Sequence, residues 1–307
     1  QRYLAQMVEA GLTHVVLETT SHGWAQHRID ACEFDIGVAT NITHEHLDYH
    51  GTYENYRAAK GRLFTSLAET KPKACGNIYL GVLNRDDKSY PYLADVTKVR
   101  QVCYGHSPDS NIRAVDISYD PGGIHFTAEG DDFGVKVQSP LVGAFNVSNC
   151  LAALTAAVIG LGIDPQLAAA GIANLREVPG RMERIDLGQS FAAIVDFAPT
   201  PNALKVTLET ARQMTKGRVI CAFGSAGLRD KEKRRMMAET SAELADLTVL
   251  TAEDPRTESL EGILEEMAVG ARSRGGSEGV TFWRVADRGA AIRFALRFAR
   301  PGDIVLS

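Results

Sequence analysis

Short runs of β-branched and other apolar residues alternate, along the first part of the chain, with stretches whose apolar positions recur every three or four residues. Three of the runs predict strands: 14–18, 36–40 and 80–83. The stretch 52–69 predicts a helix with Thr52 as its amino-terminal cap, and residues 1–10 are expected to be the last turns of another. This alternation favours a mostly parallel sheet covered by helices.

The pattern changes between residues 96 and 140, where glycine-rich turns separate short apolar runs. The runs are 112–118, 123–128 and 134–138. Runs of this spacing predict an antiparallel meander packed beside the main sheet. Two alanine-rich helices, at 146–160 and 165–174, are expected to close the first unit.

The alternation of strands and helices starts again after residues 178–180, Val-Pro-Gly, which are the expected hinge. The predicted strands are 192–196, 219–223, 247–251, 281–285 and the buried run near 302–307. The predicted helices are 201–214, 231–244, 258–273 and 287–299. The sequence therefore predicts an α/β protein of two units, with a domain boundary between residues 177 and 178 and a Rossmann-like second unit.

The composition is that of an ordinary globular protein and excludes several classes of partner. Hydrophobic residues make up 45% and charged residues 23% of the 307 residues, and the formal net charge is −5. No nucleic acid and no anionic membrane is therefore expected as a partner. The five cysteines are scattered and never spaced as Cys-x-x-Cys, which argues against disulfides and structural zinc and predicts a cytoplasmic protein.

Three histidines and two acids are concentrated in residues 40–51, directly after a predicted strand, and Glu18 ends another predicted strand. The carboxyl ends of parallel strands lie on one edge of a sheet, where α/β proteins bind ligands. We expect a metal or phosphate site at this edge, although a polar loop with capping acids would show the same pattern.

Lys60 lies on the apolar stripe of the predicted helix 52–69. It comes four residues after Tyr56 and four before Phe64, so it shares their face. Two interpretations remain open: the side chain extends to solvent past apolar neighbours, or it is a buried amine with a lowered pKa, available for covalent chemistry.

No P-loop of the form GxxxxGK[ST] is present, so the usual phosphate-binding signature is absent from this sequence. The turn 224–230 follows a predicted strand and precedes a predicted helix. A turn in that position predicts an anion-binding site at the helix amino terminus, although many α/β proteins have such turns for backbone reasons.

Several segments together resemble the Mur ligases of peptidoglycan synthesis, in the order of that family and over nearly the whole chain. The segments are 17–23, 26–28, 40–51, 56–60, 143–149, 178–183, 195–201, 224–235 and 254–256. Residues 46–51 most resemble the branch that adds the third amino acid of the stem peptide. The resemblance implies a central ATPase domain at 1–177 and a carboxyl-terminal domain at 178–307. It also implies that an amino-terminal domain and the P-loop precede Gln1.

The activity that this resemblance implies is ATP-dependent amide formation through an acyl phosphate. The implied substrates are UDP-N-acetylmuramoyl-L-alanyl-D-glutamate and an amino acid, and the implied cofactors are ATP and Mg²⁺. Glu18 and His46 resemble magnesium ligands, and Lys60 matches a carbamylated lysine that helps to hold the metal. Without a P-loop, residues 1–307 alone are not expected to turn over ATP.

The resemblance also assigns residues to the two substrates and the nucleotide. The implied nucleotide contacts are Asn149 to adenine, Asp196 to ribose, and Arg181 and Thr200 near the phosphates. The implied contacts to the muramoyl peptide are Ser21, Gln26 and Arg28. The implied pocket for the incoming amino acid holds Arg229, Glu253, Asp254 and Arg256. The planar guanidinium of Arg256 suits the distal carboxylate of meso-diaminopimelate, whereas Asp254 favours a cationic side chain or pairs with Arg256 itself.

The sequence departs from the family pattern at three places. Pro199 stands where His is usual, Glu45 replaces Asp before His46, and Glu253 with Asp254 replaces Asp-Asn. Pro199 and Glu45 leave open a homologue without catalytic activity. A second alternative is another amide ligase of the same family, of the polyglutamate or cyanophycin type, which residues 46–51 disfavour. A monomer is expected.

Overall fold

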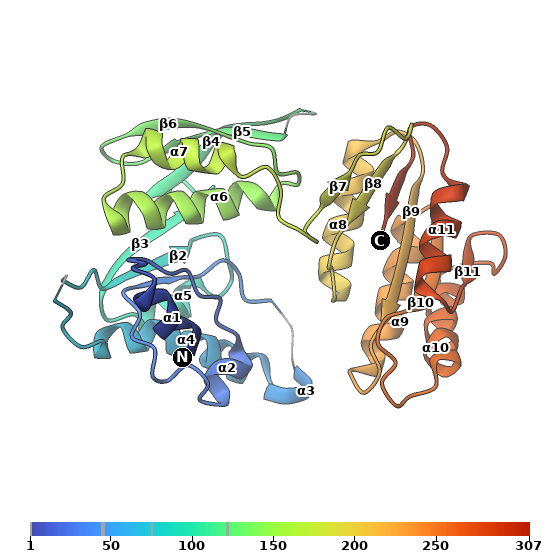
Figure 1. Cartoon of the computed structure of the whole chain (residues 1–307), viewed down its shortest axis with the longest axis horizontal. Helices are drawn as coiled ribbons and strands as arrows, with labels where there is room; N and C mark the ends of the chain where they lie inside the picture. Colours follow the sequence, from blue (N-terminus) through green and yellow to red (C-terminus); the bar gives the residue numbers. More distant parts are fainter. Residues whose placement is uncertain (1, 44–46, 75, 121–122) are drawn as a thin grey trace. The chain divides into compact units, whose positions relative to one another are not determined.

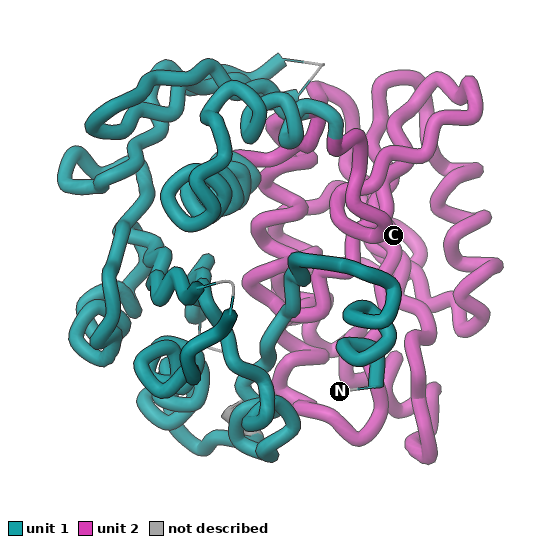
Figure 2. Tube along the Cα trace, turned by 60° about the vertical axis from the view of Figure 1, so that its left-hand side comes forward, with its two compact units in different colours: residues 1–139, 145–174 teal, residues 140–144, 175–307 magenta. Residues whose placement is uncertain are grey.

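The computed structural model describes residues 2–43, 47–74, 76–120 and 123–307. The chain forms two compact units, coloured separately in Figure 2. Unit 1 comprises residues 1–139 and 145–174, and unit 2 comprises residues 140–144 and 175–307. The predicted domain boundary at 177 and 178 lies close to the second crossing between the units.

Unit 1 is built on a six-stranded sheet with the order β1-β2-β3-β4-β5-β6. The strands are β1 Ile36–Val38, β2 Leu80–Asn84, β3 Arg100–Gly105, β4 Ile112–Asp120, β5 Gly123–Glu129 and β6 Gly134–Ser139. Strands β1 to β4 are parallel, and β4, β5 and β6 are antiparallel. The predicted meander is present, but it continues the main sheet by hydrogen bonds between β3 and β4 and is not packed beside it.

Helices cover both faces of this sheet (Figure 1). They are α1 Arg2–Glu9, α2 Ser21–Ala25, α3 Leu47–His50, α4 Tyr53–Ser66, α5 Tyr90–Val96, α6 Phe145–Thr155 and α7 Pro165–Asn174. A 3₁₀ turn, Leu67–Glu69, extends α4, and a π-helical turn, Ala156–Gly160, extends α6. Successive side chains of β2 point to opposite faces of the sheet. Val82 packs with α6 in one core, and Leu83 packs with Phe64 of α4 in another.

The prediction of a strand at 14–18 is wrong. Residues 12–20 form no helix or strand, and Val15, Val16 and Leu17 are exposed. A strand needs hydrogen-bond partners along its backbone, and within the described part of unit 1 β1 pairs with β2 alone. The β-branched residues of this run therefore match the sequence pattern of a strand, although no described strand pairs with them.

The helix predicted at 52–69 is confirmed, including its cap. Thr52 lies in the extended region, and its hydroxyl oxygen accepts a hydrogen bond from the amide of Asn55 at 3.2 Å. The 3₁₀ turn completes the predicted length. The helix at the start of the chain and the helices near 146–160 and 165–174 are also confirmed.

Unit 2 contains a second six-stranded sheet with the order β11-β10-β9-β12-β8-β7. Its strands are β7 Glu183–Ile185, β8 Ala192–Val195, β9 Val219–Ser225, β10 Leu247–Ala252, β11 Phe282–Arg284 and β12 Ile304–Leu306. All pairs are parallel except that of β7 with β8. The five predicted strands are confirmed, and β7 is an edge strand that the pattern did not reveal.

The helices of unit 2 are α8 Pro201–Met214, α9 Lys231–Leu244, α10 Leu260–Ser273 and α11 Arg288–Phe298, and all four were predicted. Leu208, Met237 and Met267 place α8, α9 and α10 in one core. Ala291 and Ala295 of α11 pack in a separate core with Val249 and Val305. Figure 1 shows α8 and α11 on opposite sides of the strands.

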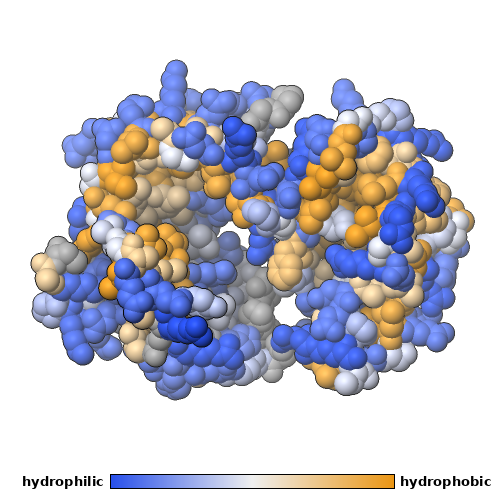
Figure 3. Space-filling model, viewed as in Figure 1, coloured by the Kyte–Doolittle hydropathy of each residue, from blue (hydrophilic) through white to orange (hydrophobic). Residues whose placement is uncertain are grey.

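Apolar and hydrophilic residues are interspersed on the face shown in Figure 3. Among the described residues, no helix combines the length and the apolar character that a membrane span needs.

Candidate functional site

The segment after β1 is held in place by two side chains at and just after the end of β2. The Asn84 amide nitrogen donates to the carbonyl oxygen of Thr40 at 2.6 Å, and the Asp87 carboxylate accepts from the amide of Ile42 at 3.3 Å. Neither Asn84 nor Asp87 was predicted. Their position at a strand end, in the run Asn-Arg-Asp-Asp, is the signal that could have found them.

The three residues predicted to hold magnesium are not assembled into a described site. His46, together with Glu45, lies outside the described residues. Glu18 is exposed on the irregular segment 12–20, and not at the end of a strand as predicted. In the described ranges no three His, Cys, Asp or Glu residues are grouped as metal ligands. The magnesium sites stay a prediction.

Lys60 is half-buried on α4, on the same face as the buried Tyr56. Its Nζ lies 5.6 Å from the centre of the Tyr56 ring, within the range of a cation–π contact. The contact with Tyr56 agrees with the predicted shared face, and the half-burial of Lys60 lies between the two interpretations left open by the sequence. Its carbamylation stays a prediction.

The residues predicted to contact the muramoyl peptide lie in and after α2. The Thr20 hydroxyl oxygen caps this helix by accepting from the amide of Gly23 at 3.0 Å. Ser21 is 2% exposed, and within the described structure its Oγ has no hydrogen-bond partner. Gln26 caps the other end of α2, and both Gln26 and Arg28 are exposed.

Asn149, the predicted adenine contact, lies within α6. Its side chain is exposed at the surface of unit 1 and donates to Asn146 Oδ1 at 3.0 Å. It does not cap the helix, because α6 already begins at Phe145. A bond between two side chains one turn apart fixes the orientation of the Asn149 amide.

Three predicted nucleotide residues are gathered at the carboxyl end of β8. The carboxylate of Asp196 accepts a hydrogen bond from the Thr207 hydroxyl of α8. Thr200 caps the amino terminus of α8 through the amide of Ala203 at 3.2 Å. The guanidinium of Arg181 lies 5.1 Å from the centre of the exposed Phe197 ring.

A backbone hydrogen bond brings these residues together. The amide of Phe197 donates to the carbonyl oxygen of Gly180 at 2.8 Å, which joins the segment before β7 to the end of β8. Pro199, the departure from the family pattern, is half-buried directly before the Thr200 cap. Arg181, Asp196 and Thr200 therefore lie at one edge of the sheet, and their roles as nucleotide contacts stay a prediction.

The four residues of the predicted amino-acid pocket lie on two neighbouring loops, one after β9 and one after β10. The amide of Gly227 donates to the carbonyl oxygen of Asp254 at 2.7 Å. A Cβ atom at Gly227 would lie 2.0 Å from the carbonyl oxygen of Pro255, so only glycine permits this approach. The loops of Arg229 and of Glu253 to Arg256 are therefore in direct contact.

Asp254 partly neutralises Arg256, which is one of the two outcomes considered from the sequence. Asp254 Oδ1 accepts from the Arg256 amide at 3.1 Å, and Asp254 Oδ2 lies 3.7 Å from Arg256 Nε. Arg229 and Glu253 are exposed. An exposed pair at this separation is weak, so a ligand carboxylate can compete for the guanidinium.

The predicted anion-binding turn at 224–230 is not supported. Asp230 caps α9, and its Oδ1 accepts from the amides of Glu232 at 3.0 Å and Lys233 at 3.4 Å. A carboxylate already occupies the amides that would bind an anion, and it repels one.

Sequence reasoning did not single out Arg234 and Glu258. Arg234 is fully buried, and its two terminal nitrogens each lie 2.9 Å from an oxygen of Glu258. Hydrogen bonds from Arg234 and from the Leu228 amide lower the pKa of Glu258 to about 2. Arg234 falls in a run of charged residues, which usually indicates a solvated helix face, so the sequence offers no signal for its burial.

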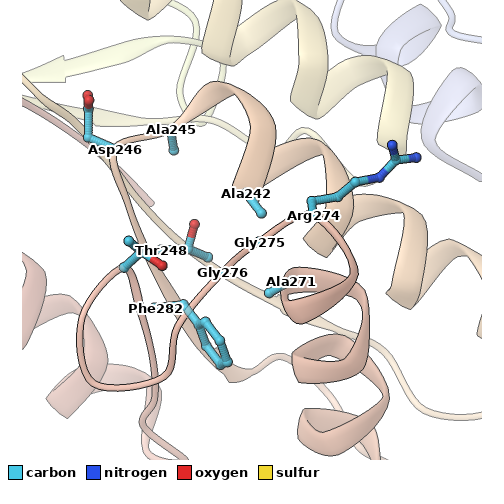
Figure 4. A pocket seen from close by; sticks show the side chains of 10 residues that line it. Ala242, Ala245, Asp246, Thr248, Ala271, Arg274, Gly275, Gly276 and Phe282 are labelled. Atoms are coloured by element: carbon cyan, nitrogen blue, oxygen red, sulfur yellow. The ribbon is translucent and has the colours of Figure 1, made fainter.

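A hollow of about 100 Å³ lies elsewhere in unit 2, near the starts of β10 and β11 (Figure 4). It is smaller than a typical ligand pocket, and the predicted residues do not line it. Figure 4 shows the Arg274 guanidinium directed away from the other lining residues. Its Nη1 lies 3.0 Å from Glu243 Oε1.

The chain has two α/β units, each with a largely parallel sheet, and the candidate residues of unit 2 lie at the carboxyl ends of its strands. Residues 1–157 match the Mur ligase middle domain, and residues 180–307 match the Mur ligase, glutamate ligase domain. The chain belongs to the Mur ligase family.

Curated relatives match the chain over its whole length. One, the UDP-N-acetylmuramoyl-L-alanyl-D-glutamate--2,6-diaminopimelate ligase of Geobacillus thermodenitrificans, is 40% identical over 310 residues, which cover 100% of this chain and 61% of the relative. The UDP-N-acetylmuramyl-tripeptide synthetase of Roseiflexus sp. is 40% identical over 312 residues, with the same coverage. The chain thus spans about 60% of the length of these relatives.

Solved structures show the same fold. A UDP-N-acetylmuramoyl-L-alanyl-D-glutamate--2,6-diaminopimelate ligase has a TM-score of 0.63 and 32% identity, covering 99% of this chain and 60% of the other. The Mycobacterium tuberculosis folylpolyglutamate synthase has a TM-score of 0.69 and 19% identity, covering 89% of this chain and 60% of the other, and is similar in fold alone.

Proposed function

We propose that this chain forms the central and carboxyl-terminal parts of an ATP-dependent amide ligase. The ligase adds 2,6-diaminopimelate to UDP-N-acetylmuramoyl-L-alanyl-D-glutamate in peptidoglycan synthesis. The observation that carries the proposal is the 40% identity, over 100% of the chain, to relatives named for that reaction. The candidate residues at the strand ends of unit 2 support it.

The reaction has two steps. The D-glutamate carboxylate takes the γ-phosphoryl group of ATP and releases ADP, and the amine of the amino acid then attacks the acyl carbon, releases phosphate and loses a proton. ATP supplies the phosphoryl group, and bound Mg²⁺ neutralises phosphate charge. In this proposal Glu18, His46 and Lys60, the last as a carbamate, hold the metal.

The residues at the end of β8 provide nucleotide contacts in unit 2. The Thr207 hydroxyl fixes the rotamer of Asp196 by its hydrogen bond, which orients the carboxylate to accept from a ribose hydroxyl. Arg181 supplies positive charge near the phosphates, and Thr200 supplies the cap of α8. In unit 1, Asn149 contacts the adenine base.

The amino-acid pocket comprises Arg229, Glu253, Asp254 and Arg256. The guanidinium of Arg256 pairs with the distal carboxylate of diaminopimelate in place of Asp254. Asp254 and Glu253 then accept from the ammonium group beside that carboxylate. Lysine and ornithine carry a distal ammonium without the carboxylate, so they leave Arg256 without a ligand partner.

The test is an amide-forming assay of the full-length enzyme with meso-diaminopimelate, lysine and ornithine side by side. Arg256→Ala should raise the KM for diaminopimelate, whereas Arg293→Ala, which removes an exposed arginine of α11, should leave it unchanged. If lysine or ornithine is preferred, and Arg256→Ala keeps that preference at full rate, the assignment of diaminopimelate is wrong. Inactivity with the muramoyl dipeptide would favour another ligase of the family.

The location and assembly of the enzyme follow from this reaction. In this proposal the enzyme works in the cytoplasm, where ATP and nucleotide-linked substrates are present, and it works as a monomer. Sedimentation of the full-length enzyme at working concentration tests the monomer, and a stable dimer would contradict it.

A further inference from the structure

The buried Arg234 contacts both loops of the predicted amino-acid pocket. Besides Glu258, its guanidinium donates to Glu266 Oε2 at 2.8 Å and to the carbonyl oxygen of Ala226 at 3.3 Å. Ala226 belongs to the turn after β9, Glu258 to the loop after β10, and Glu266 to α10. One side chain of α9 therefore connects all three segments.

Glu258 in turn fixes the backbone of the turn after β9. Its Oε1 accepts a hydrogen bond from the amide of Leu228, whose φ is 52°. A residue with a side chain rarely adopts this left-handed conformation. Burial of the side chain does not explain it, because Leu228 is 58% exposed. The hydrogen bond from its amide to Glu258 stabilises the backbone in this conformation.

The Arg234–Glu258 pair lies next to the residues assigned to the incoming amine. Arg229 directly follows Leu228, and Arg256, also left-handed with a φ of 51°, lies on the loop that carries Glu258. We propose that Arg234 and Glu258 are positioning residues for the amino-acid pocket, because the pair holds the two loops together and so fixes the separation of Arg229 and Arg256. This inference rests on the proposed function, which assigns the pocket.

A role in stability alone does not account for the pair. Burial of a guanidinium is costly, and apolar side chains of similar volume often stabilise a core equally well. Helices α9 and α10 already pack through Met237, Met267 and Ala271. An apolar residue at position 234 would extend that packing, but it would not form hydrogen bonds with groups of both loops.

The experiment measures the kinetics of the full-length enzyme with Glu258→Ala, Glu258→Gln and Arg234→Lys. Glu258→Ala removes the acceptor for the Leu228 amide and should raise the KM for the amino acid about tenfold or more. The KM for ATP should stay within about twofold. Glu258→Gln keeps one carbonyl oxygen and should give an intermediate KM, as should Arg234→Lys, which keeps the charge without the two-pronged contact.

Arg272→Met is the matched control in the same unit. Arg272 pairs with Glu265 at 2.7 Å and Glu278 at 2.6 Å and contacts neither loop of the pocket in the described structure. A KM that rises equally in this variant would overturn the proposal. A lower kcat in Glu258→Ala, with the KM for the amino acid unchanged, would overturn it as well, because loss of folded enzyme gives that result.

A second readout does not need catalysis. Hydrogen exchange of residues 1–307 should show faster exchange at the Leu228 amide in Glu258→Ala than in the parent, with α10 still protected. Unchanged protection of Leu228 would overturn the inference. A parent enzyme without amide-forming activity would instead refute the proposed function, so the two failures are distinguishable.

Discussion

Replacement of Gly227 by alanine should force apart the loops that follow β9 and β10. A Cβ atom at position 227 would lie 2.0 Å from the carbonyl oxygen and 2.6 Å from the carbonyl carbon of Pro255. Carbon and oxygen atoms outside bonds stay about 3.3 Å apart, so the loops must separate by more than about 1 Å. The hydrogen bond from the Gly227 amide to Asp254, at 2.7 Å, would then be lost.

The expected cost combines two terms. Overpacking of a closely fitted site costs about 1–3 kcal/mol, and a lost hydrogen bond costs about 1 kcal/mol. The free energy of unfolding of unit 2 should therefore fall by about 2–4 kcal/mol. Urea denaturation followed by tryptophan fluorescence measures it. In a Trp24→Phe background, Trp283 is the remaining tryptophan and reports on unit 2 alone.

Gly262→Ala is the control for this prediction. Gly262 lies in the first turn of α10, where a Cβ atom would meet Ser259 Cβ at 3.6 Å, an ordinary contact. Alanine is favoured over glycine in helices by up to about 1 kcal/mol, so this variant should be neutral or more stable. If Gly227→Ala is as stable as the parent, the close approach of the two loops is refuted.

Three further changes test other parts of the molecule. Glu258→Gln should destabilise unit 2 most above pH 4.5, the ordinary pKa of the carboxyl, and least near pH 2, its pKa in the folded protein, because a carboxyl with a lowered pKa stabilises the fold only while it is ionised. Urea unfolding at several pH values tests this, and a loss of stability that does not change with pH would contradict it. Leu208→Ala should cost about 2–5 kcal/mol, because Leu208 is fully buried, and the same denaturation assay measures it. Lys60→Ala should remove most activity of the full-length enzyme, with partial recovery in small carboxylic acids, whereas full activity of Lys60→Arg would exclude a carbamate.

Elements with local signals could be predicted from the sequence. Thr52 gives α4 its cap, and the helices of unit 2 follow directly from apolar spacing between capping residues. The prediction of a strand at 14–18 was wrong because a strand depends on a pairing partner that is distant in sequence. For the same reason the hydrogen bonding of β4 to β3 was missed, since the pattern of the meander does not specify which strand it joins.

Some residues of the candidate site could likewise be identified from the sequence, and others could not. Asp196 and Arg229 were assigned through the resemblance to the family, and both lie on loops at the carboxyl ends of strands. Arg234 could not be identified, because its burial depends on Glu258, 24 residues away, and on a turn that Glu258 itself stabilises. The sequence shows that Asp254 departs from the family pattern, but only the structure shows that it pairs weakly with Arg256.

Product analysis of the full-length enzyme tests the central claim most directly. The enzyme is incubated with UDP-N-acetylmuramoyl-L-alanyl-D-glutamate, ATP, Mg²⁺ and meso-diaminopimelate. The molecular mass of the product is then measured by mass spectrometry, and the ADP formed is quantified. The account predicts a nucleotide-linked peptide whose mass exceeds that of the substrate by one diaminopimelate residue, with one ADP formed for each molecule of this product. ADP formation without that product, or an unchanged substrate, would contradict it.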